Sequence, residues 1–258
     1  MIDVWREEHP VRFTAVDRSD RLSLAAAFDL FQEAALCHAE SLGVGRDSLA
    51  RTGQVWVLSR MSVYMERRPR FGERMTVETW PRGWEKLFAV RDYRIEAPEG
   101  NTAVRGRSGW LILDIEKRRP LRVQPVVENL PSNEGRSAFS ALPPGLGERP
   151  GLQQTARRTA LYSDIDFNGH VNNARYIQWI EDALPEGILE GAHAMRLDVN
   201  YLSEVKRGEA VELWTGTFAP EGAGADMPRS PSAAIALEGR RPEDGKAVLR
   251  AELVTGAA

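Results

Sequence analysis

Cysteine and histidine are scarce in this sequence, which has one Cys and four His among its 258 residues. The single Cys, Cys37, excludes an internal disulfide. Low cysteine usage is also typical of a reducing compartment, so we expect a cytoplasmic location. The sequence contains no CxxC, HExxH, GxGxxG or phosphate-binding loop motif, which are common signatures of metal and nucleotide sites. Metal and nucleotide chemistry are therefore not expected.

Long apolar runs are missing as well. No stretch approaches the roughly 18 consecutive apolar residues of a membrane span, and the charged N-terminal residues MIDVWREEHPVRF lack the apolar core of an export signal. Because no transit peptide is recognisable, a bacterial cytoplasm is the expected location. A formal net charge of -3 and a pI near 5.9 argue against non-specific nucleic-acid binding.

Residues 24–42 and 176–184 show the three- and four-residue spacing of helices. The first segment is apolar or small on most faces, which indicates a largely buried helix, and the second ends at Pro185. Strand-like runs rich in Val, Thr, Trp and Tyr follow each helix. They cover residues 55–65, 74–80, 88–96 and 102–114 in the first half, and 195–202, 210–218, 232–239 and 246–254 in the second.

The two halves of the chain repeat each other. In the strand regions the matching residues lie 136 positions apart, as Arg60 and Arg196, Val63 and Val199, Gly72 and Gly208, and Glu73 and Glu209. The helices match at an offset of 148, which pairs Phe28 with Tyr176 and Glu33 with Glu181. We interpret the repeat as two copies of one unit, each a long helix followed by an antiparallel sheet.

One buried helix wrapped by an antiparallel sheet is the hotdog fold, so the repeat predicts an α+β double hotdog, with two hotdog units in tandem. The two sheets could join edge to edge and so cover strands that would otherwise stay open. We expect an N-terminal hotdog over residues 1–123, a linker rich in Pro, Gly and Ser over 124–158, and a C-terminal hotdog over 159–258 that carries the catalytic residues.

Five polar side chains directly precede the second helix. Asp166, Asn168 and His170 are spaced by two, which places them on one face of an extended chain, unless Gly169 introduces a turn. Either of the two Asn residues at 172 and 173 can cap the helix, but a cap needs one such group, not five. A helix N-terminus can stabilise an oxyanion formed in acyl transfer. We therefore predict a catalytic helix end, with capping alone as the alternative.

The first half lacks this polar set at the helix-based offset. Leu22 takes the place of His170 there, and Asp20 takes the place of Asn168. This asymmetry predicts one active site per chain, in the C-terminal unit, with the N-terminal unit shaping an apolar pocket.

The string D-x-N-x-H-V-N-N-x-x-Y-x-x-W, which runs from Asp166 to Trp179, resembles the acyl-ACP thioesterases of plant plastids and bacteria. The first half is similar to the same family in LFQEAALCHAESLG, VWVLSRMSVYMERRPRFGERMTVETWPRG and RGRSGWLILDIEKRRPLRV, so the resemblance covers about residues 11–254. It implies hydrolysis of fatty acyl-ACP thioesters to free fatty acid and holo-ACP. It also implies acyl carrier protein (ACP) as the partner, and neither a metal nor an organic cofactor.

The resemblance assigns roles to single residues. The family's catalytic Asp, Asn and His match Asp166, Asn168 and His170, and its later acidic residue matches Glu204. Many plant members carry a Cys after this Glu, where this sequence has Val205, so a Cys–His mechanism is not expected. We expect Glu204 to activate water as a general base, with His170 and Asn168 orienting the water and the carbonyl and Asp166 positioning His170. Direct attack by a carboxylate through an anhydride is the alternative.

The expected substrate-binding residues lie in both units. They are Asn172, Asn173 and Tyr176 in the C-terminal unit, and Leu30, Phe31, Ala34 and Trp56 in the N-terminal unit, which would hold the acyl chain. Because ACP is acidic, we also expect a basic surface patch. The candidates are Arg67, Arg68 and Arg70, and separately Lys117, Arg118, Arg119 and Arg122.

Other functions stay open from the sequence. An acyl-CoA thioesterase, including the aryl-CoA type, could use the same site with a different carrier. A non-catalytic acyl-thioester binding protein is a second alternative, against which the D-x-N-x-H set and Glu204 argue. A hotdog dehydratase is a third, but the sequence lacks the His-Phe…Pro-Gly arrangement of those enzymes. Either a monomer or a homodimer is compatible with two hotdogs in one chain.

Overall fold

The computed structural model describes residues 3–220 and 226–256. The strands are β1 (Trp5–Pro10), β2 (Gln54–Met65), β3 (Arg74–Glu85), β4 (Phe88–Glu96), β5 (Thr102–Asp114), β6 (Pro120–Leu121), β7 (Gln153–Thr159), β8 (Ala194–Tyr201), β9 (Ala210–Thr217), β10 (Pro231–Arg240) and β11 (Ala247–Gly256). The helices are α1 (Leu24–Ser41), α2 (Arg46–Ala50), α3 (Gln124–Val127) and α4 (Asn173–Ala183). Short 3-10 turns are η1 (Phe13–Ala15), η2 (Pro98–Gly100) and η3 (Tyr162–Asp164).

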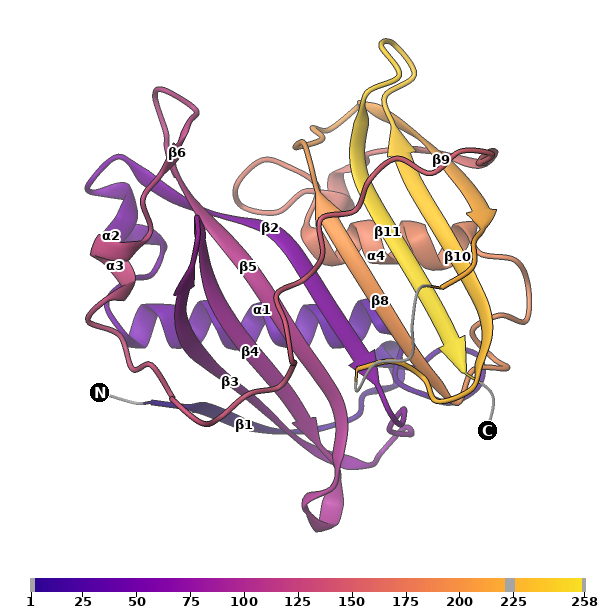
Figure 1. The fold of residues 1–258 in the computed structure, drawn as a ribbon, viewed down its shortest axis with the longest axis horizontal. Helices are drawn as coiled ribbons and strands as arrows, with labels where there is room; N and C mark the ends of the chain where they lie inside the picture. The colour runs from indigo at the N-terminus through magenta and orange to yellow at the C-terminus, as the bar shows by residue number, and fades with distance from the viewer. Residues whose placement is uncertain (1–2, 221–225, 257–258) are drawn as a thin grey trace.

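One antiparallel sheet of eleven strands runs through the described residues, in the order β1-β3-β4-β5-β2-β8-β11-β10-β9-β7, with β6 paired to β5 (Figure 1). The two halves of the chain meet where β2 pairs with β8, and Ser62 lies opposite Asp198 at this seam. Pairing across the seam leaves neither half with an open edge there. The two long helices, α1 and α4, lie on one face of the sheet (Figure 1). The double hotdog predicted from the repeat is confirmed.

Helix α1 begins and ends at residues suited to these positions. The hydroxyl of Ser23 accepts the backbone N–H of Ala26 (3.1 Å), which satisfies one free donor of the first turn. Gly43 follows the last turn with a φ of +73°, and its N–H donates to the carbonyl of Glu40 (3.0 Å). Between these ends, apolar residues at three- and four-residue spacing face the sheet and α4. They are Leu24, Ala25, Ala27, Phe28, Phe31, Ala34 and Ala35.

The duplication is visible in backbone hydrogen bonds that recur in both halves. The N–H of Leu22 donates to the carbonyl of Pro69 (2.8 Å), and in the second half the N–H of Val171 donates to the carbonyl of Val205 (2.8 Å). The strand regions thus match at the predicted offset of 136.

The helices, however, match at an offset of 149, since Ser23 caps α1 and Asn172 caps α4. The predicted offset of 148 was therefore wrong by one residue. Apolar residues cover several faces of α1, so hydrophobic spacing alone could not set the register, whereas the caps do.

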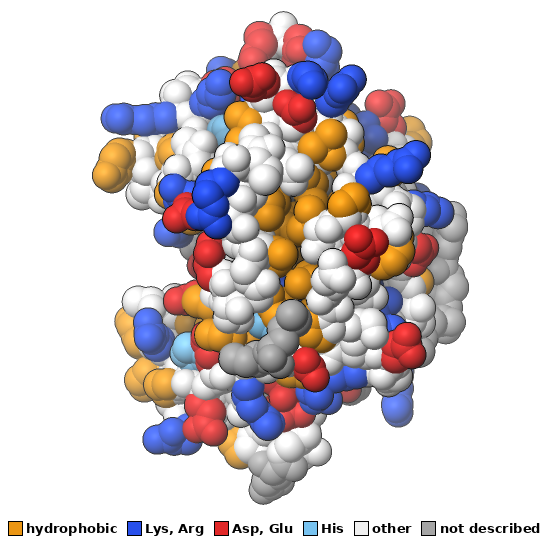
Figure 2. Space-filling view, turned by 90° about the vertical axis from the view of Figure 1, so that its left-hand side faces the viewer, with side chains coloured by type: hydrophobic (Ala, Val, Ile, Leu, Met, Phe, Trp, Pro, Cys, Tyr) orange, Lys and Arg blue, Asp and Glu red, His pale blue; other side chains and the backbone are white. Residues whose placement is uncertain are grey.

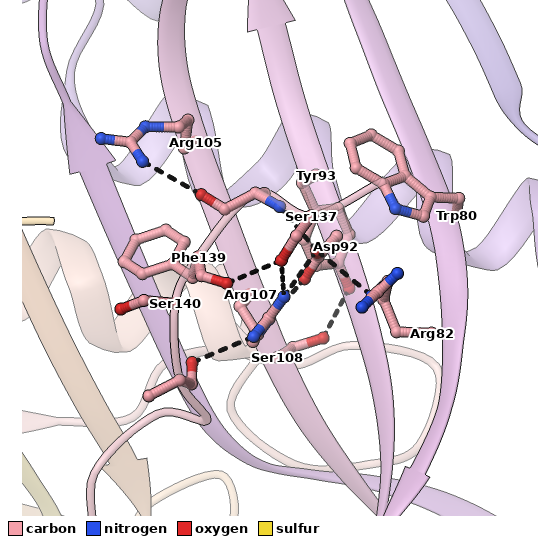
Figure 3. Close-up of polar contacts among 12 residues, drawn as sticks. Trp80, Arg82, Asp92, Tyr93, Arg105, Arg107, Ser108, Ser137, Phe139 and Ser140 are labelled. Atoms are coloured by element: carbon pink, nitrogen blue, oxygen red, sulfur yellow. Dashed lines mark hydrogen bonds and ion pairs between the residues drawn. The ribbon is translucent and has the colours of Figure 1, made fainter. Parts of the chain in front are cut away.

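Residues 128–152, which we call the strap, cross the face of the sheet opposite to the helices (Figure 1). Beneath the strap the carboxylate of Asp92 is fully buried. It accepts two hydrogen bonds from the guanidinium of Arg107 (2.6 and 2.8 Å) and one from the backbone N–H of Ala138 (2.7 Å) (Figure 3). The hydroxyl of Ser137 accepts another N–H of the same guanidinium (2.7 Å). The buried ion pair is therefore completed by the strap.

The strap also forms a hydrogen bond and an ion pair with the second half. Leu146 donates its N–H to the side-chain oxygen of Asn200 (2.8 Å), and Arg149 pairs with Glu252 (2.8 Å). The expected linker over 124–158 contains α3, the strap and all of β7 except its last residue. Because β7 pairs with β9, the strands of the second half begin at Gln153.

Candidate active site

The polar stretch ahead of α4 is a loop that turns back on itself. The N–H of Asp166 donates to the carbonyl of His170 (2.9 Å), and the N–H of Gly169 donates to the carbonyl of Asp166 (3.0 Å). Gly169 has a φ of +82°, a left-handed conformation that favours Gly. The expected alternation of Asp166, Asn168 and His170 therefore ends at this turn, which brings His170 to the start of α4.

Asp166 uses its carboxylate inside the loop. One oxygen accepts the backbone N–H of Asn168 (2.8 Å), and the other accepts that residue's side-chain N–H (3.4 Å). The contact with His170 runs through the backbone alone. Asn168 is exposed, and Asp166 and His170 are half-buried, so the three predicted residues lie together at the surface end of the loop.

The two Asn residues that follow have different partners. The side-chain oxygen of Asn172 accepts the N–H of Ala174 (2.8 Å) and so caps α4. The side-chain amide of Asn173 donates to the side-chain oxygen of Gln32 in α1 (3.3 Å), and the backbone carbonyl of Asn173 accepts the hydroxyl of Tyr201 (3.2 Å). The start of α4 is thus tied to both the first half and β8.

Tyr176 lies in the core beneath this helix end. Its ring packs edge-on against Trp179, with 5.3 Å between ring centroids, and against Tyr201 at 5.9 Å. Burial raises the pKa of both tyrosine hydroxyls, so they stay protonated. Tyr176 therefore supports the floor of the site.

Glu204 comes from the segment after β8, and its backbone is fixed on both sides. The carbonyl of Val205 accepts the N–H of Val171 (2.8 Å), and the guanidinium of Arg241 donates to the carbonyl of Glu204 (2.5 Å). The Glu204 carboxylate contacts Nε2 of His170, and each side chain is 32% exposed. The structure therefore brings the two residues together at the amino end of α4.

Two arginines from the first half complete the surroundings of the loop, and neither was predicted as a site residue. Nη2 of Arg118, in the turn between β5 and β6, contacts the second carboxylate oxygen of Glu204. The guanidinium of Arg46, at the start of α2, lies 4.6 Å from the ring centroid of Phe167, which is 60% exposed. Arg118 belongs to a run of cations for which the sequence predicts a basic surface patch that meets ACP.

An apolar cavity lies inside the first half, between α1, α3 and strands β2 to β5. It is partly open to solvent, about 70 Å³ of it can be occupied by the centre of a water-sized molecule, and its lining includes Trp56, Ala35, Ala89 and Trp110. Figure 2 faces the side that carries α2 and α3 and shows apolar side chains along a hollow between polar and charged ones. The fold thus offers room for an apolar chain within the first unit.

Of the four N-terminal residues expected to hold the acyl chain, Trp56 lines this cavity. Its indole N–H donates to the carbonyl of Val44 (2.8 Å). Phe31 is fully buried and packs on the ring of Tyr93, with 4.9 Å between centroids. Ala34 is also fully buried, and Leu30 is half-buried against the core.

The first half has a polar counterpart of the site. At the offset of 149, Asp17 corresponds to Asp166 and Arg21 to His170, so the expectation of an apolar counterpart was wrong. Arg68, which corresponds to Glu204 in the strand offset, is 5% exposed and cannot belong to a surface patch. Its guanidinium contacts Asp17 and donates to the carbonyls of Leu22 (3.0 Å) and Leu189 (2.9 Å).

The side chains around α4 suit proton transfer and oxyanion stabilisation. A His in contact with a carboxylate can take a proton from water, and a helix N-terminus favours negative charge. Within residues 3–220 and 226–256, no group of three or more His, Cys, Asp and Glu is placed to hold a metal ion. In the same residues, no helix combines the length and apolar character of a membrane span.

Comparison with protein families gives two matches that follow each other along the chain. The acyl-ACP thioesterase N-terminal domain matches residues 2–130, and the acyl-ACP thioesterase C-terminal domain matches residues 149–231. Among solved structures, an acyl-ACP thioesterase from Bacteroides thetaiotaomicron is similar, with a TM-score of 0.79 and 24% identity, covering 98% of this chain and 97% of that one. The 12:0-ACP thioesterase from Umbellularia californica gives 0.76 and 23%, with the same coverage.

Curated relatives come from plants. The chloroplastic acyl-[acyl-carrier-protein] hydrolase FATB2 of Cuphea viscosissima is 28% identical, over 86% of this chain and 57% of its own length. The chloroplastic oleoyl-acyl carrier protein thioesterase 1 of Arabidopsis thaliana is 25% identical, over 83% of this chain and 64% of its own length. The chain therefore spans little more than half the length of the first of these relatives. On these matches, the chain belongs to the acyl-ACP thioesterase family.

Proposed function

We propose that this protein hydrolyses fatty acyl-ACP thioesters to free fatty acid and holo-ACP. The observation that carries the proposal is the contact between the Glu204 carboxylate and Nε2 of His170 at the amino end of α4. The family membership and the names of the plant relatives, which are ACP hydrolases and thioesterases, support the substrate.

In the proposed reaction, the oxygen of water bonds to the thioester carbonyl carbon, and the carbon–sulfur bond breaks. The His170–Glu204 pair accepts the proton of the attacking water and returns a proton to the departing thiolate. Glu204 acts as the base and His170 shares its proton, while Asn168 orients the carbonyl. Asp166 shapes the loop that carries His170 and Asn168. The first turn of α4, capped by Asn172, stabilises the oxyanion.

The acyl chain extends from this site into the first unit. The cavity lined by Trp56 supplies an apolar environment, and Ala35, Leu36 and Ala39 form the surface of α1 that bounds the path of the acyl chain. In the second unit, Asn173 and Tyr176 set the position of α4 relative to the acyl chain.

The carrier docks on the turn between β5 and β6 in this proposal. Lys117, Arg119 and Arg122 are exposed there, and Arg118 of the same turn reaches Glu204. We prefer this turn to the other candidate patch, Arg67 and Arg70, because the turn lies next to Glu204. Arg67 is also already paired with Glu73 (3.0 Å). A cytoplasmic location fits the single Cys, which is half-buried on α1 with the pKa of its thiol raised by burial.

The test is a thiol-release assay on matched acyl-ACP and acyl-CoA substrates. We expect Glu204→Gln and His170→Ala to lower kcat by roughly 10²-fold or more on acyl-ACP, with circular dichroism unchanged. Glu243→Gln removes an exposed carboxylate that pairs with the same Arg241 and should leave kcat unchanged.

Three outcomes would contradict parts of the proposal. Equal turnover of acyl-CoA and acyl-ACP would defeat the carrier assignment. Near-normal turnover in either site variant would remove that residue from the mechanism. Tight binding of acyl thioesters by the wild-type protein without thiol release would favour the non-catalytic alternative.

A further inference from the structure

We propose that Arg118, contributed by the first half, is a positioning residue that fixes the Glu204 carboxylate against His170. The inference rests on the proposed function, because it assigns Arg118 a part in that reaction. Arg118 and Glu204 are 86 residues apart in the sequence, and they meet only because β2 and β8 join the two halves.

The first argument is the geometry of the carboxylate. Nη2 of Arg118 contacts Oε1 of Glu204, and Nε2 of His170 contacts Oε2. With one contact on each oxygen, the carboxylate cannot rotate about its last bond without losing both. A Glu side chain that is 32% exposed would otherwise sample several rotamers. Arg118 thereby holds the orientation in which Glu204 meets His170.

The second argument is the backbone of Arg118. The residue has a φ of +52°, in the left-handed region that Gly and Asn favour, so an Arg there costs roughly 1 kcal/mol. The turn is otherwise well bonded: the N–H of Arg118 donates to the carbonyl of Asp114 (2.9 Å), and the N–H of Lys117 donates to the Asp114 side chain (2.9 Å). Glycine would suit the turn better, so the turn itself does not account for the guanidinium.

The third argument is that global stability does not explain the contact. The Arg118 side chain is 62% exposed, and exposed ion pairs typically stabilise a fold by less than about 1 kcal/mol. That gain does not clearly exceed the cost of the left-handed backbone. The contact does restrict the orientation of the Glu204 carboxylate, and this is the role that we assign to Arg118.

Arg118→Gly separates these contributions, since Gly relieves the backbone while removing the guanidinium. We expect kcat to fall about tenfold or more with KM nearly unchanged, both on acyl-ACP and on a carrier-free acyl-pantetheine. The thermal midpoint should stay the same or rise. Guanidinium ion added at non-denaturing concentration should restore part of the lost kcat, and Arg118→Lys should keep part of it.

Lys86→Gly is the matched control. Lys86 is an exposed cation in the turn between β3 and β4, with a φ of +57°. Among the described residues, the basic residues that contact the Glu204 carboxylate are Arg118 and His170, not Lys86. This variant should leave kcat unchanged. In NMR spectra, the ring resonances of His170 should shift in Arg118→Gly and stay in place in Lys86→Gly, a result that does not depend on turnover.

An unchanged kcat for acyl-pantetheine in Arg118→Gly, or a rise in KM for acyl-ACP alone, would overturn the proposal and make Arg118 a carrier contact. Unchanged His170 resonances in that variant would also overturn it. If the wild-type protein releases no thiol while the His170 resonances still respond to Arg118→Gly, the proposed function fails and the positioning contact stands.

Discussion

At the residue scale, the Asp166 side chain does not contact His170, although its position in the motif suggests that it positions this residue. Its carboxylate accepts the backbone N–H of Asn168 (2.8 Å), a local turn that neutral Asn can also form. Asp166 bonds to His170 through the backbone, since the Asp166 N–H donates to the His170 carbonyl. The negative charge of Asp166 therefore matters less than its hydrogen-bond acceptor, which holds the loop in shape.

This reading predicts different results for two substitutions at the same site. Asp166→Asn keeps an acceptor oxygen and should lower kcat/KM by only a fewfold. Asp166→Ala loses the turn and should cost about 1 kcal/mol of local order and more than tenfold in kcat/KM. Steady-state kinetics on acyl-ACP measure both. Equal losses in the two variants would indicate that the charge itself is required.

Single residues were predictable from the sequence to different degrees. His170 could be named from the polar stretch ahead of the helix, and Glu204 from the resemblance to the family, and the structure places the two in contact. Arg118 could not, since nothing in a run of cations marks the one that reaches a carboxylate 86 residues away. Arg68 was misassigned for the same reason: the other cations of its run, Arg67 and Arg70, are exposed, and only the fold shows that Arg68 is buried.

At the element scale, helix α1 receives a second cap from α4. The Glu181 carboxylate accepts the N–H of Leu24 (2.8 Å) and that of Ala25 (3.4 Å), at the end of α1 that carries partial positive charge. Burial raises the pKa of Glu181 to about 7, more than these hydrogen bonds lower it. The contact is thus both a helix cap and a buried acid.

The raised pKa predicts how stability depends on pH. The folded protein binds the Glu181 proton more readily than the unfolded chain, so ionisation of this group opposes folding. The loss of stability caused by ionising Glu181 is absent below pH 4.5, grows as the pH rises from there to about 7, and stays constant above that. Glu181→Gln should keep an acceptor and flatten this part of the stability profile in urea unfolding at several pH values. The exposed Glu33→Gln is the control, and an unchanged slope in Glu181→Gln would contradict the assignment.

Elements with a strong pattern were predicted closely. The strands expected over 88–96 and 102–114 coincide with β4 and β5, and more than half of the residues in each strand are buried. β1 and β7 were not predicted. Their sequences, WREEHP and QQTARRT, lie at the two edges of the sheet and carry polar residues on both faces, so they lack the apolar alternation that marks a strand.

At the scale of the whole molecule, the two halves share one backbone plan but use the equivalent position differently. In the second half the segment after β8 presents Glu204 to His170. In the first half the equivalent segment presents Arg68, which contacts Asp17 and the carbonyl of Leu189 in the second half. Hydrogen bonds from Ser19 and Arg68 outweigh burial and hold the pKa of Asp17 below its usual range. In the first half, the counterpart of the site is therefore a brace, in which Arg68 links Asp17 to the carbonyl of Leu189 in the second half.

Removing this brace should destabilise the whole chain. Arg68→Met removes the cation beside Asp17, whose carboxylate keeps its bonds from Ser19, and takes the Arg68 donors from two carbonyls, so we expect a loss of about 3 kcal/mol in the free energy of unfolding by urea. Arg67→Met, next in sequence but exposed and paired with Glu73, should change stability by less than about 1 kcal/mol. Similar losses in the two variants would show that Arg68 does not join the halves.

The strap also determines how copies of this chain can assemble. Residues of the strap already occupy the sheet face opposite the helices, held by Asp92 in the first half and Asn200 in the second. A second copy could stack its sheet there only after those hydrogen bonds were broken. Self-association without that rearrangement is therefore restricted to other surfaces, and within the described sheet β1, β7 and the short β6 are paired on one side alone.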